Sequence, residues 1–481
     1  MMIRCYLLLA LALALAGCAS QGGFSKAGIP LLDAPGSKQP VHTQLAPGKY
    51  EASIMAIGSD HDLARERGQN LGFVNNRGLK TWLKGIRERL LAVSGITDVP
   101  GTVQITANTT YAAYATADGN VMISIAWLTD IESEDEIAAI IAHEISHVLL
   151  KHQATDVIGL TQKRLQSMHE MLVGGRMSAT RATQLGKADS KALLAAQLSV
   201  KLVDTIIMPA WNRRQETEAD LLGLDLMIKA GYSPEGMQAM LERLRSSERK
   251  SRLAEEAMQQ RLKEIAARDP AKAVQTAIDT FVSELASKHP ETDQRLDGIS
   301  EYQERHYDLL QPPKLTITTL KKIRTTRDIG PVLANYQHVA RAKNRLEQGK
   351  VKEAYSEAVL GAQKPTAMDA LPNWILWKTA VAYGKQQQHK KALEIALNSP
   401  EPIPDIYNEV IRYNEEQRNY QAALGFANKA SEVFGDDPTW TPVRIRLLTR
   451  LGRKNEAQGL VLQCSVKTPQ IRKECYDATK S

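Results

Sequence analysis

The segment His143-Glu144-Ile145-Ser146-His147 constrains the fold more than any other feature of this 481-residue chain. Two histidines four residues apart lie on one face of a helix, where both imidazoles can contact the same metal ion. Glu144 follows the first histidine and can act as a general base on a water molecule beside that ion. Paired imidazoles on a helix are typical of zinc, so we expect one Zn²⁺ per chain. The alternative is a purely structural histidine pair.

The residues around this segment predict a helix that begins near Glu134. Ser133 can accept a hydrogen bond from the backbone N–H of Glu136, while the Glu136 side chain reaches back to Ser133. Apolar residues recur at helical spacing between positions 137 and 149, which predicts a largely buried helix. Lys151 and His152 are expected to close it with positive charge at its C-terminal end. Both histidines should therefore lie mid-helix on a rigid support.

A third metal ligand must come from another segment, because catalytic zinc sites use three protein ligands and leave one position for water. The best candidate is the acidic start of a second long helix, where Glu216 and Asp220 lie one turn apart on one face. We expect Glu216 to bind the metal and Asp220 to accept a hydrogen bond from a metal-bound histidine. Glu218 points elsewhere and is expected to be solvated. The alternative is that these acidic residues only compensate the helix dipole.

Two later segments complete a pattern that resembles a known family. Gly231-Tyr232-Ser233-Pro234 follows the second helix, and Ser287-Lys288-His289-Pro290 is followed by Arg295. With the two histidine and acidic motifs, they resemble the family 48 metallopeptidases, the HtpX-like and BepA-like group, over roughly residues 60 to 310. The resemblance implies a gluzincin-type zinc metallopeptidase whose zinc ligands are His143, His147 and Glu216 and whose catalytic base is Glu144.

The resemblance also implies a role for His289 and Arg295. Either both stabilise the oxyanion of the transition state, or His289 occupies the open zinc position in a resting state. Pro290 favours an extended conformation at His289, which predicts a loop. The alternatives are a solvated loop histidine and an ordinary surface arginine.

A β-hairpin is predicted just before the metal-binding helix. Asp118-Gly119 is a favourable turn between strands at residues 109–116 and 120–125. Its edge is where we expect a substrate to add in extended form. Residues 154–205 between the two ligand motifs are either a lid over the cleft or a helical hairpin.

The first residues predict a lipoprotein signal at positions 1–17. Arg4 precedes an apolar run from Cys5 to Ala16, which is shorter than the roughly twenty residues that span a bilayer. Leu15-Ala16-Gly17-Cys18 resembles the processing site of bacterial lipoprotein signals, so Cys18 is the expected lipidation site. Ala19, rather than Asp, implies by the same resemblance an outer-membrane anchor facing the periplasm. Residues 18–50 are rich in glycine and proline and predict a lipid-anchored flexible tether.

Cysteine content and charge limit the remaining possibilities. Of four cysteines, only Cys464 and Cys475 remain after signal removal and acylation. In an oxidising periplasm they are expected to form a disulfide, and the alternative is a pair of buried free thiols. The net charge of +7 comes from interspersed positive and negative residues and predicts no nucleic-acid partner.

The C-terminal half shows a repeat of helical segments. After an expected extended segment at residues 315–320, alanines recur at positions 354, 392, 423 and 457, with spacings of 38, 31 and 34 residues. These spacings bracket the length of a tetratricopeptide repeat, so we expect four helix pairs over residues 330–470 and a short tail at 471–481. The alternative is an ordinary helical cap that covers the peptidase.

The predicted fold is therefore mainly α with a small β-hairpin or sheet. A zinc metallopeptidase domain at residues 51–315 precedes the tetratricopeptide-like domain. The predicted function is a zinc metalloendopeptidase (EC 3.4.24 type) of the cell envelope that degrades misfolded or stalled periplasmic and outer-membrane proteins. Its repeats would dock these unfolded or misassembled proteins, or the outer-membrane assembly machinery. The alternative is a chaperone-like assembly scaffold for outer-membrane proteins with a latent zinc site.

Overall fold

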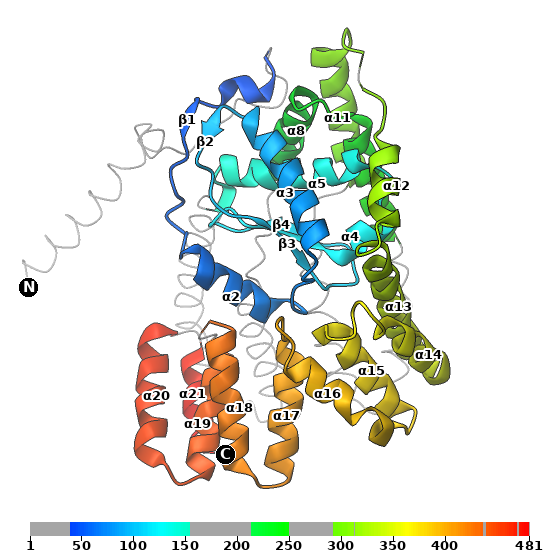
Figure 1. Cartoon of the computed structure of the whole chain (residues 1–481). Helices are drawn as coiled ribbons and strands as arrows, with labels where there is room; N and C mark the ends of the chain where they lie inside the picture. Colours follow the sequence, from blue (N-terminus) through cyan, green and yellow to red (C-terminus); the bar gives the residue numbers. More distant parts are fainter. Residues whose placement is uncertain are drawn as a thin grey trace, which may run out of the picture.

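The computed structural model describes residues 39–153, 213–249, 292–311, 313–435, 439–468 and 471–480. Within these ranges the chain is mainly helical with two small sheets, as the sequence predicts (Figure 1). The predicted signal peptide, the lipidation site Cys18, the segment 154–205 and the loop residue His289 lie outside the described residues. Among the described helices, none is both long enough and apolar enough to cross a bilayer.

The larger sheet contains the predicted hairpin and one further strand. Strands β4 (Ala113–Ala115) and β5 (Val121–Ser124) are antiparallel, and Gly119 between them has a φ of 77°. Strand β3 (Val103–Thr106), which the sequence did not predict, pairs in parallel with β5 in the order β3-β5-β4. Strand β4 is therefore at one edge of this sheet, as expected for the hairpin.

The helix that carries the predicted metal-binding histidines lies at the centre of the part of the chain expected to be the peptidase, residues 51–315 (the peptidase part). Helix α5 (Glu134–Leu149) begins with the predicted capping box between Ser133 and Glu136, and all of its side chains are buried. It packs against the sheet and, among the helices, mainly against α8 and α3. Helices of this part include α2 (Ser59–Gln69), α3 (Arg77–Ala92), α4 (Ile125–Asp130), α5, α8 (Arg213–Lys229) and α11 (Thr292–Tyr307), and residues 235–249 are also helical.

Part of the predicted tether belongs to the fold. A short 3₁₀ helix, η2 (Val41–Gln44), is followed by β1 (Gly48–Lys49), which pairs in parallel with β2 (Ile96–Thr97). The backbone N–H of His42 donates to the Asp225 carboxylate at 2.8 Å, and that of Val41 donates to the Tyr302 hydroxyl at 2.6 Å. Tyr302 in turn donates to Asp225, which is fully buried. This buried carboxylate holds residues 41–44 against α8 and α11.

The C-terminal half consists of successive helix pairs, as predicted. The four repeat alanines Ala354, Ala392, Ala423 and Ala457 are buried, each in the second helix of a pair. Small side chains at these positions allow close helix contact. The pairs are α13 (Gly330–Glu347) with α14 (Val351–Gly361), α15 (Ala370–Ala382) with α16 (Lys390–Leu397) preceded by η3 (Gln386–His389), α17 (Pro404–Glu416) with α18 (Tyr420–Val433), and α19 (Trp440–Arg450) with α20 (Lys454–Lys467).

The turns inside these pairs share a backbone feature. Each contains one residue with positive φ, namely Gly349, Gly384, Arg418 and Gly452, with φ between 56° and 75°. Glycine adopts this left-handed conformation at little cost, which explains its use at three of the four turns. The repeat is therefore visible in the backbone as well as in the alanine spacing.

A disulfide closes the C-terminal end of the repeat region. Cys464 on α20 is bonded to Cys475 on α21 (Arg472–Asp477), and both residues are buried. The bridge is the first of the two alternatives that the sequence allowed for these cysteines. It attaches the segment predicted as a tail to the last helix pair.

The prediction of an extended segment at residues 315–320 is wrong for residues 317–320, because these residues are helical. Helix α12 (Ile317–Thr325) buries Leu320, and Arg324 donates hydrogen bonds to the backbone carbonyls of Leu128 and Thr129. The sequence is rich in Ile and Thr, which favour strands, but contacts with the peptidase part override that local preference.

The hydrophobic core divides later in the chain than the predicted domain boundary. One cluster of buried apolar residues extends from Val41 to Ile406 and includes the first two helix pairs. A second cluster runs from Tyr407 to Cys475. The first two pairs therefore share a core with the peptidase part, and only the later pairs have a core of their own.

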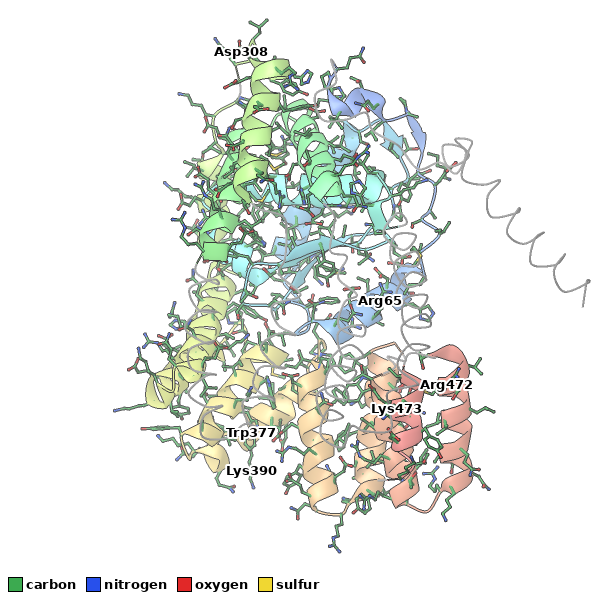
Figure 2. All side chains as sticks on the ribbon, turned by 180° about the vertical axis from the view of Figure 1, so that it is seen from behind. Arg65, Asp308, Trp377, Lys390, Arg472 and Lys473 are labelled. Carbon is green, nitrogen blue, oxygen red and sulfur yellow. A yellow bond between two sulfur atoms is a disulfide. The ribbon has the colours of Figure 1, made fainter. Side chains whose placement is uncertain are left out.

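Helix α2 lies between the sheet and the repeat helices (Figures 1 and 2). Its Arg67 Nε lies 2.9 Å from Glu401 Oε2 in the loop before α17. Gly72 has a φ of 76°, and a Cβ there would lie 2.8 Å from the backbone oxygen of Glu401. In the middle of α2, Ala64 is close to the third helix pair, because a Cβ on Gly435 would lie 3.2 Å from Cβ of Ala64. These contacts fix the repeat region against the peptidase part.

Replacing Gly361 is expected to test the packing of the first helix pair. A Cβ at Gly361 would lie 2.7 Å from Cγ2 of Val339 on α13, so Gly361→Ala should destabilise the protein by about 1–3 kcal/mol. Gly425→Ala is the matched control, because no atom lies within 4 Å of its added Cβ, and it should stabilise by about 0.5–1 kcal/mol. Thermal denaturation of both variants measures the difference. Equal shifts in the two would contradict this packing.

Candidate metal centre

Two packed helices bring together the three predicted metal ligands. His143 and His147 on α5 are 4% and 0% exposed, and Glu216 on α8 is fully buried. The two helices approach closely because α8 has a glycine at the contact, where a Cβ on Gly223 would lie 3.1 Å from the backbone nitrogen of His143. A larger residue would push Glu216 away from the histidines.

The spacing of these ligand atoms suits a single zinc ion. Nε2 of His143 lies 3.2 Å from Nε2 of His147, and the Glu216 carboxylate oxygens lie 3.5 Å and 3.8 Å from the same two nitrogens. Ligands at tetrahedral zinc, with bonds of about 2.0–2.1 Å, are separated by about 3.3 Å. One atom from each residue lies within 4.8 Å of the others. The donor set and its geometry therefore fit the metal that the sequence predicts.

Glu144 lies next to His143 on the same helix and is only 4% exposed. It is not a member of the three-residue ligand cluster. A carboxylate that is buried beside a metal site, but is not one of its ligands, is suited to act as a base. The arrangement is compatible with the role predicted for Glu144.

Asp220 and Arg295 form a buried ion pair behind His143. Asp220 Oδ1 lies 2.8 Å from His143 Nδ1, and Arg295 donates two hydrogen bonds to Asp220 at 2.7 Å and 2.8 Å. Arg295 Nη1 also lies 3.2 Å from Glu216 Oε2. Arg295 is only 7% exposed, so the alternative of a surface cation is wrong. In this structure its guanidinium faces the two carboxylates of α8, and a contact with a reacting oxyanion stays a prediction.

The pKa values of these groups follow from burial and pairing. Burial opposes ionisation of Asp220, but Arg295 and His143 outweigh it and hold the pKa of Asp220 well below its usual range. Burial alone would lower the pKa of His143, whereas Asp220 and Glu216 raise it above its ordinary value. Burial also disfavours the charged form of Arg295, but the same carboxylates raise its pKa. Asp220 is therefore a carboxylate that can orient the His143 ring.

A second buried group lies behind His147, and the sequence analysis missed it. His152 Nδ1 lies 2.8 Å from His147 Nδ1, and His152 Nε2 lies 3.2 Å from Glu218 Oε2. Arg214 Nε donates to the other oxygen of Glu218 at 2.7 Å. The expectation of a solvated Glu218 is wrong, because this residue is only 9% exposed. The cause is His152, which covers that side of α8.

His152 does not close helix α5 as a positive charge. The helix ends at Leu149, and Lys151 has a φ of 53°, which turns the chain so that His152 packs back toward His147. Burial lowers the pKa of His152, which favours its neutral form. The only sequence signal was a histidine five residues after His147, a spacing that does not match a helical face.

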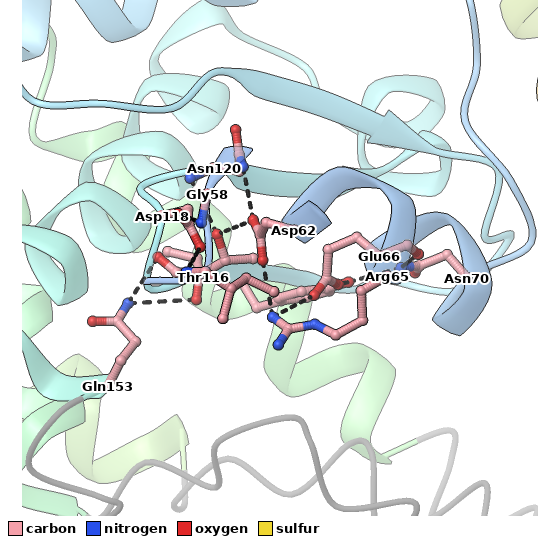
Figure 3. Close-up of polar contacts among 12 residues, drawn as sticks. Gly58, Asp62, Arg65, Glu66, Asn70, Thr116, Asp118, Asn120 and Gln153 are labelled. Atoms are coloured by element: carbon pink, nitrogen blue, oxygen red, sulfur yellow. Dashed lines mark hydrogen bonds and ion pairs between the residues drawn. The ribbon is translucent and has the colours of Figure 1, made fainter. Parts of the chain in front are cut away.

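A polar network fixes the β4–β5 hairpin to helix α2 (Figure 3). Asp62 accepts hydrogen bonds from Thr116 Oγ1 at 2.6 Å and from Asn120 Nδ2 at 2.7 Å. One turn further on, Glu66 accepts a hydrogen bond of 2.5 Å from the Tyr114 hydroxyl, and burial raises the pKa of Glu66. Both α2 carboxylates are almost fully buried. The network holds the edge strand in place relative to the peptidase core.

Two further contacts attach the hairpin turn. Asp118 accepts hydrogen bonds from the backbone N–H groups of Ile57 and Gly58, where α2 begins. On the other side, Gln153 beyond the end of α5 donates to the Thr116 carbonyl at 3.4 Å (Figure 3). The hairpin therefore has polar contacts with α2 and with the segment that follows the metal-binding helix.

Comparison with known proteins identifies the matching region. Residues 78–303 match the sequence profile of Peptidase family M48. The chain is 28% identical over 167 residues to the mitochondrial metalloendopeptidase OMA1 of Schizosaccharomyces pombe, a match covering 35% of this chain and 44% of the relative. It is 24% identical over 201 residues to the beta-barrel assembly-enhancing protease of Escherichia coli (strain K12), covering 41% and 40%.

A third relative is the metalloprotease LoiP of Escherichia coli (strain K12), with 30% identity over 135 residues, 27% of this chain and 46% of the relative. The chain thus spans less than half the length of each of these three proteins. The profile match contains helices α5 and α8, and with them all three residues of the metal cluster. This chain therefore carries a metallopeptidase domain of peptidase family M48, the family that its sequence motifs resemble.

Proposed function

We propose that this protein is a zinc-dependent endopeptidase of the cell envelope that degrades misfolded or stalled periplasmic and outer-membrane proteins. The observation that carries the proposal is the convergence of His143, His147 and Glu216 at one buried point, with Glu144 beside it. A structural zinc site normally has four protein ligands and needs no base. Three ligands with an adjacent carboxylate favour hydrolysis.

The chemistry divides among the residues of the site. A zinc ion held by the three ligands would polarise the peptide carbonyl and favour ionisation of water. Glu144 takes a proton from the attacking water and passes it to the leaving amine. Asp220 fixes the orientation of the His143 ring through its 2.8 Å contact with Nδ1. His289, in the role that the sequence resemblance implies, either supports the oxyanion or closes the site at rest.

Substrate binding is proposed at the edge of β4 that faces away from β5. Ser124 N–H donates to the Ala112 carbonyl and Thr116 N–H to the Asn120 carbonyl, so these residues pair with β5. By the alternation of antiparallel pairing, Ala113 and Ala115 direct their backbone groups to the opposite side, where the Ala115 carbonyl accepts a 3.5 Å hydrogen bond from Gln153 Nε2 that a substrate would replace. An unfolded chain can add there as a further strand and be held in extended form across the site.

The location and substrates are proposed from the sequence and the relatives. The lipoprotein-like start of the chain supports lipid anchoring at Cys18 on the periplasmic side of the outer membrane. A relative named beta-barrel assembly-enhancing protease supports unfolded outer-membrane proteins as the substrate class. A barrel precursor exposes extended, unpaired strands, which suit capture by an edge strand.

The repeat region is proposed to hold the substrate before cleavage. A groove between the last two helix pairs is lined by Leu424, Asn428, Arg444, Leu448, Arg453, Glu456, Gly459 and Leu460. Its combination of leucines and arginines suits an unfolded segment with both apolar and polar side chains. We propose that this groove binds barrel precursors and retains them near the peptidase.

Replacing the proposed base tests the reaction. Glu144→Gln keeps the size of the side chain but removes its basicity, so cleavage of an unfolded barrel protein should fall by about 100- to 10,000-fold. Zinc content, measured by metal analysis, should stay near one ion per chain. Glu132→Gln is the matched control, because Glu132 is exposed and is not a member of the metal cluster, and it should cleave normally. Zinc-loaded wild type without cleavage would favour the scaffold alternative.

Metal removal should lower stability as well as activity. Glu216 and Asp220 are buried near a single guanidinium, so a divalent cation compensates charge that the described residues leave unbalanced. Free zinc at 1,000 times its Kd would stabilise the wild type by about 4 kcal/mol. Thermal denaturation with zinc or with chelator should show this shift in wild type and not in Glu216→Gln. An identical shift in both would place the stabilising zinc elsewhere.

Filling the repeat groove tests substrate docking. Gly459→Phe places a ring in the groove, and no atom lies within 4 Å of the added Cβ. Turnover of an unfolded barrel protein should fall severalfold while cleavage of a short peptide is unchanged. Gly425→Phe has the same open surroundings but is not among the groove residues, so it is the matched control. Equal turnover by both variants would refute docking in this groove.

A further inference from the structure

A line of polar side chains runs from the buried His147 through the buried His152 and Glu218 to Arg214, which is exposed at the surface. The imidazoles of His147 and His152 meet through their Nδ1 atoms at 2.8 Å, with ring centroids 4.9 Å apart and ring planes at 72°. His152 is 3% exposed, and its other nitrogen lies 3.2 Å from Glu218. Arg214 holds the second oxygen of Glu218.

Metal binding by His147 determines the direction of every hydrogen bond in this line. Nε2 of His147 faces the other two ligands, so it must carry no proton when a metal is bound, and Nδ1 carries the proton. His152 Nδ1 must then accept that hydrogen bond. The proton of a neutral His152 is left on Nε2, where it donates to the Glu218 carboxylate. Each polar atom along the line has one consistent role.

We propose that His152 and Glu218 are positioning residues that fix the tautomer and ring orientation of His147 for zinc binding. This inference rests on the proposed zinc site. It gives the two histidine ligands different supports, because His143 contacts a carboxylate of α8 directly whereas His147 contacts one through a second imidazole. Helix α8 thus supplies one ligand, Glu216, and orients both of the others.

Two substitutions of His152 separate this role from simple packing. In His152→Asn the side-chain oxygen occupies nearly the position of His152 Nδ1 and can still accept a hydrogen bond from His147 Nδ1. In His152→Gln the amide lies nearer the position of Nε2, so it can reach Glu218 but not His147. Zinc affinity by chelator competition should fall about 10- to 100-fold in His152→Gln and stay within about threefold of wild type in His152→Asn.

Further variants keep the test decisive. His389→Gln makes the same change at a histidine that contacts Tyr355 in the repeat region, and its zinc affinity should equal that of wild type. Glu218→Met removes the carboxylate without acting on His147 directly and should weaken zinc binding about tenfold. Denaturation of each variant in chelator reports folding without the metal. Cobalt absorption should shift in His152→Gln, because the His147 ring is no longer fixed.

The outcomes distinguish this inference from the proposed function. Normal zinc binding by wild type, with equal affinities for His152→Asn and His152→Gln, would overturn the positioning role alone. Unchanged zinc affinity in Glu218→Met would also overturn the positioning role alone, even if both His152 variants failed to fold. Wild type that binds no zinc would overturn the proposed function and this inference together. Weaker binding in His152→Gln, rescued in His152→Asn, is the result that the structure predicts.

Discussion

The rest of the structure depends on the burial of charged and metal-binding groups inside a helical core. Glu216 and Asp220 are almost fully buried, and an isolated carboxylate in such surroundings would be strongly disfavoured. Arg295 compensates part of this charge through contacts with both carboxylates. Helix α11 is thereby attached to α8, and α8 to α5, because each buried charge needs its partner. The remaining negative charge is what a divalent cation would balance.

Helix α8 carries most of the buried charged groups that need partners. Its acidic residues Glu216, Glu218, Asp220 and Asp225 face four different partners, namely the metal cluster, His152, His143 with Arg295, and the N-terminal segment at His42. Two of them orient the ligand histidines, and the last fixes residues 41–44. The leucine-rich second half of α8 packs in the hydrophobic core, and its acidic residues add directed polar contacts to that packing.

The sequence predicted those parts of the site that depend on spacing within one helix. The His143–His147 pair, the capping box at Ser133 and the Glu216–Asp220 pair all follow from helical periodicity. Glu218 was misjudged because its surroundings are set by His152, which reaches it only through the left-handed turn at Lys151. The parallel strand β3 and helix α12 were missed for the same reason, since contacts distant in sequence determine them.

Helix α2 connects the repeat region to the edge of β4 that is proposed to bind substrate. On one side, Arg67 pairs with Glu401 between the second and third helix pairs, and on the other, Asp62 and Glu66 hold the β4–β5 hairpin (Figure 3). The first two helix pairs share the core of the peptidase part. The third pair, which borders the groove, is held against α2 directly, because a Cβ on Gly435 would lie 3.2 Å from Cβ of Ala64. A segment bound by the repeats would then lie at a fixed distance from the edge strand, which favours cleavage of chains long enough to reach both.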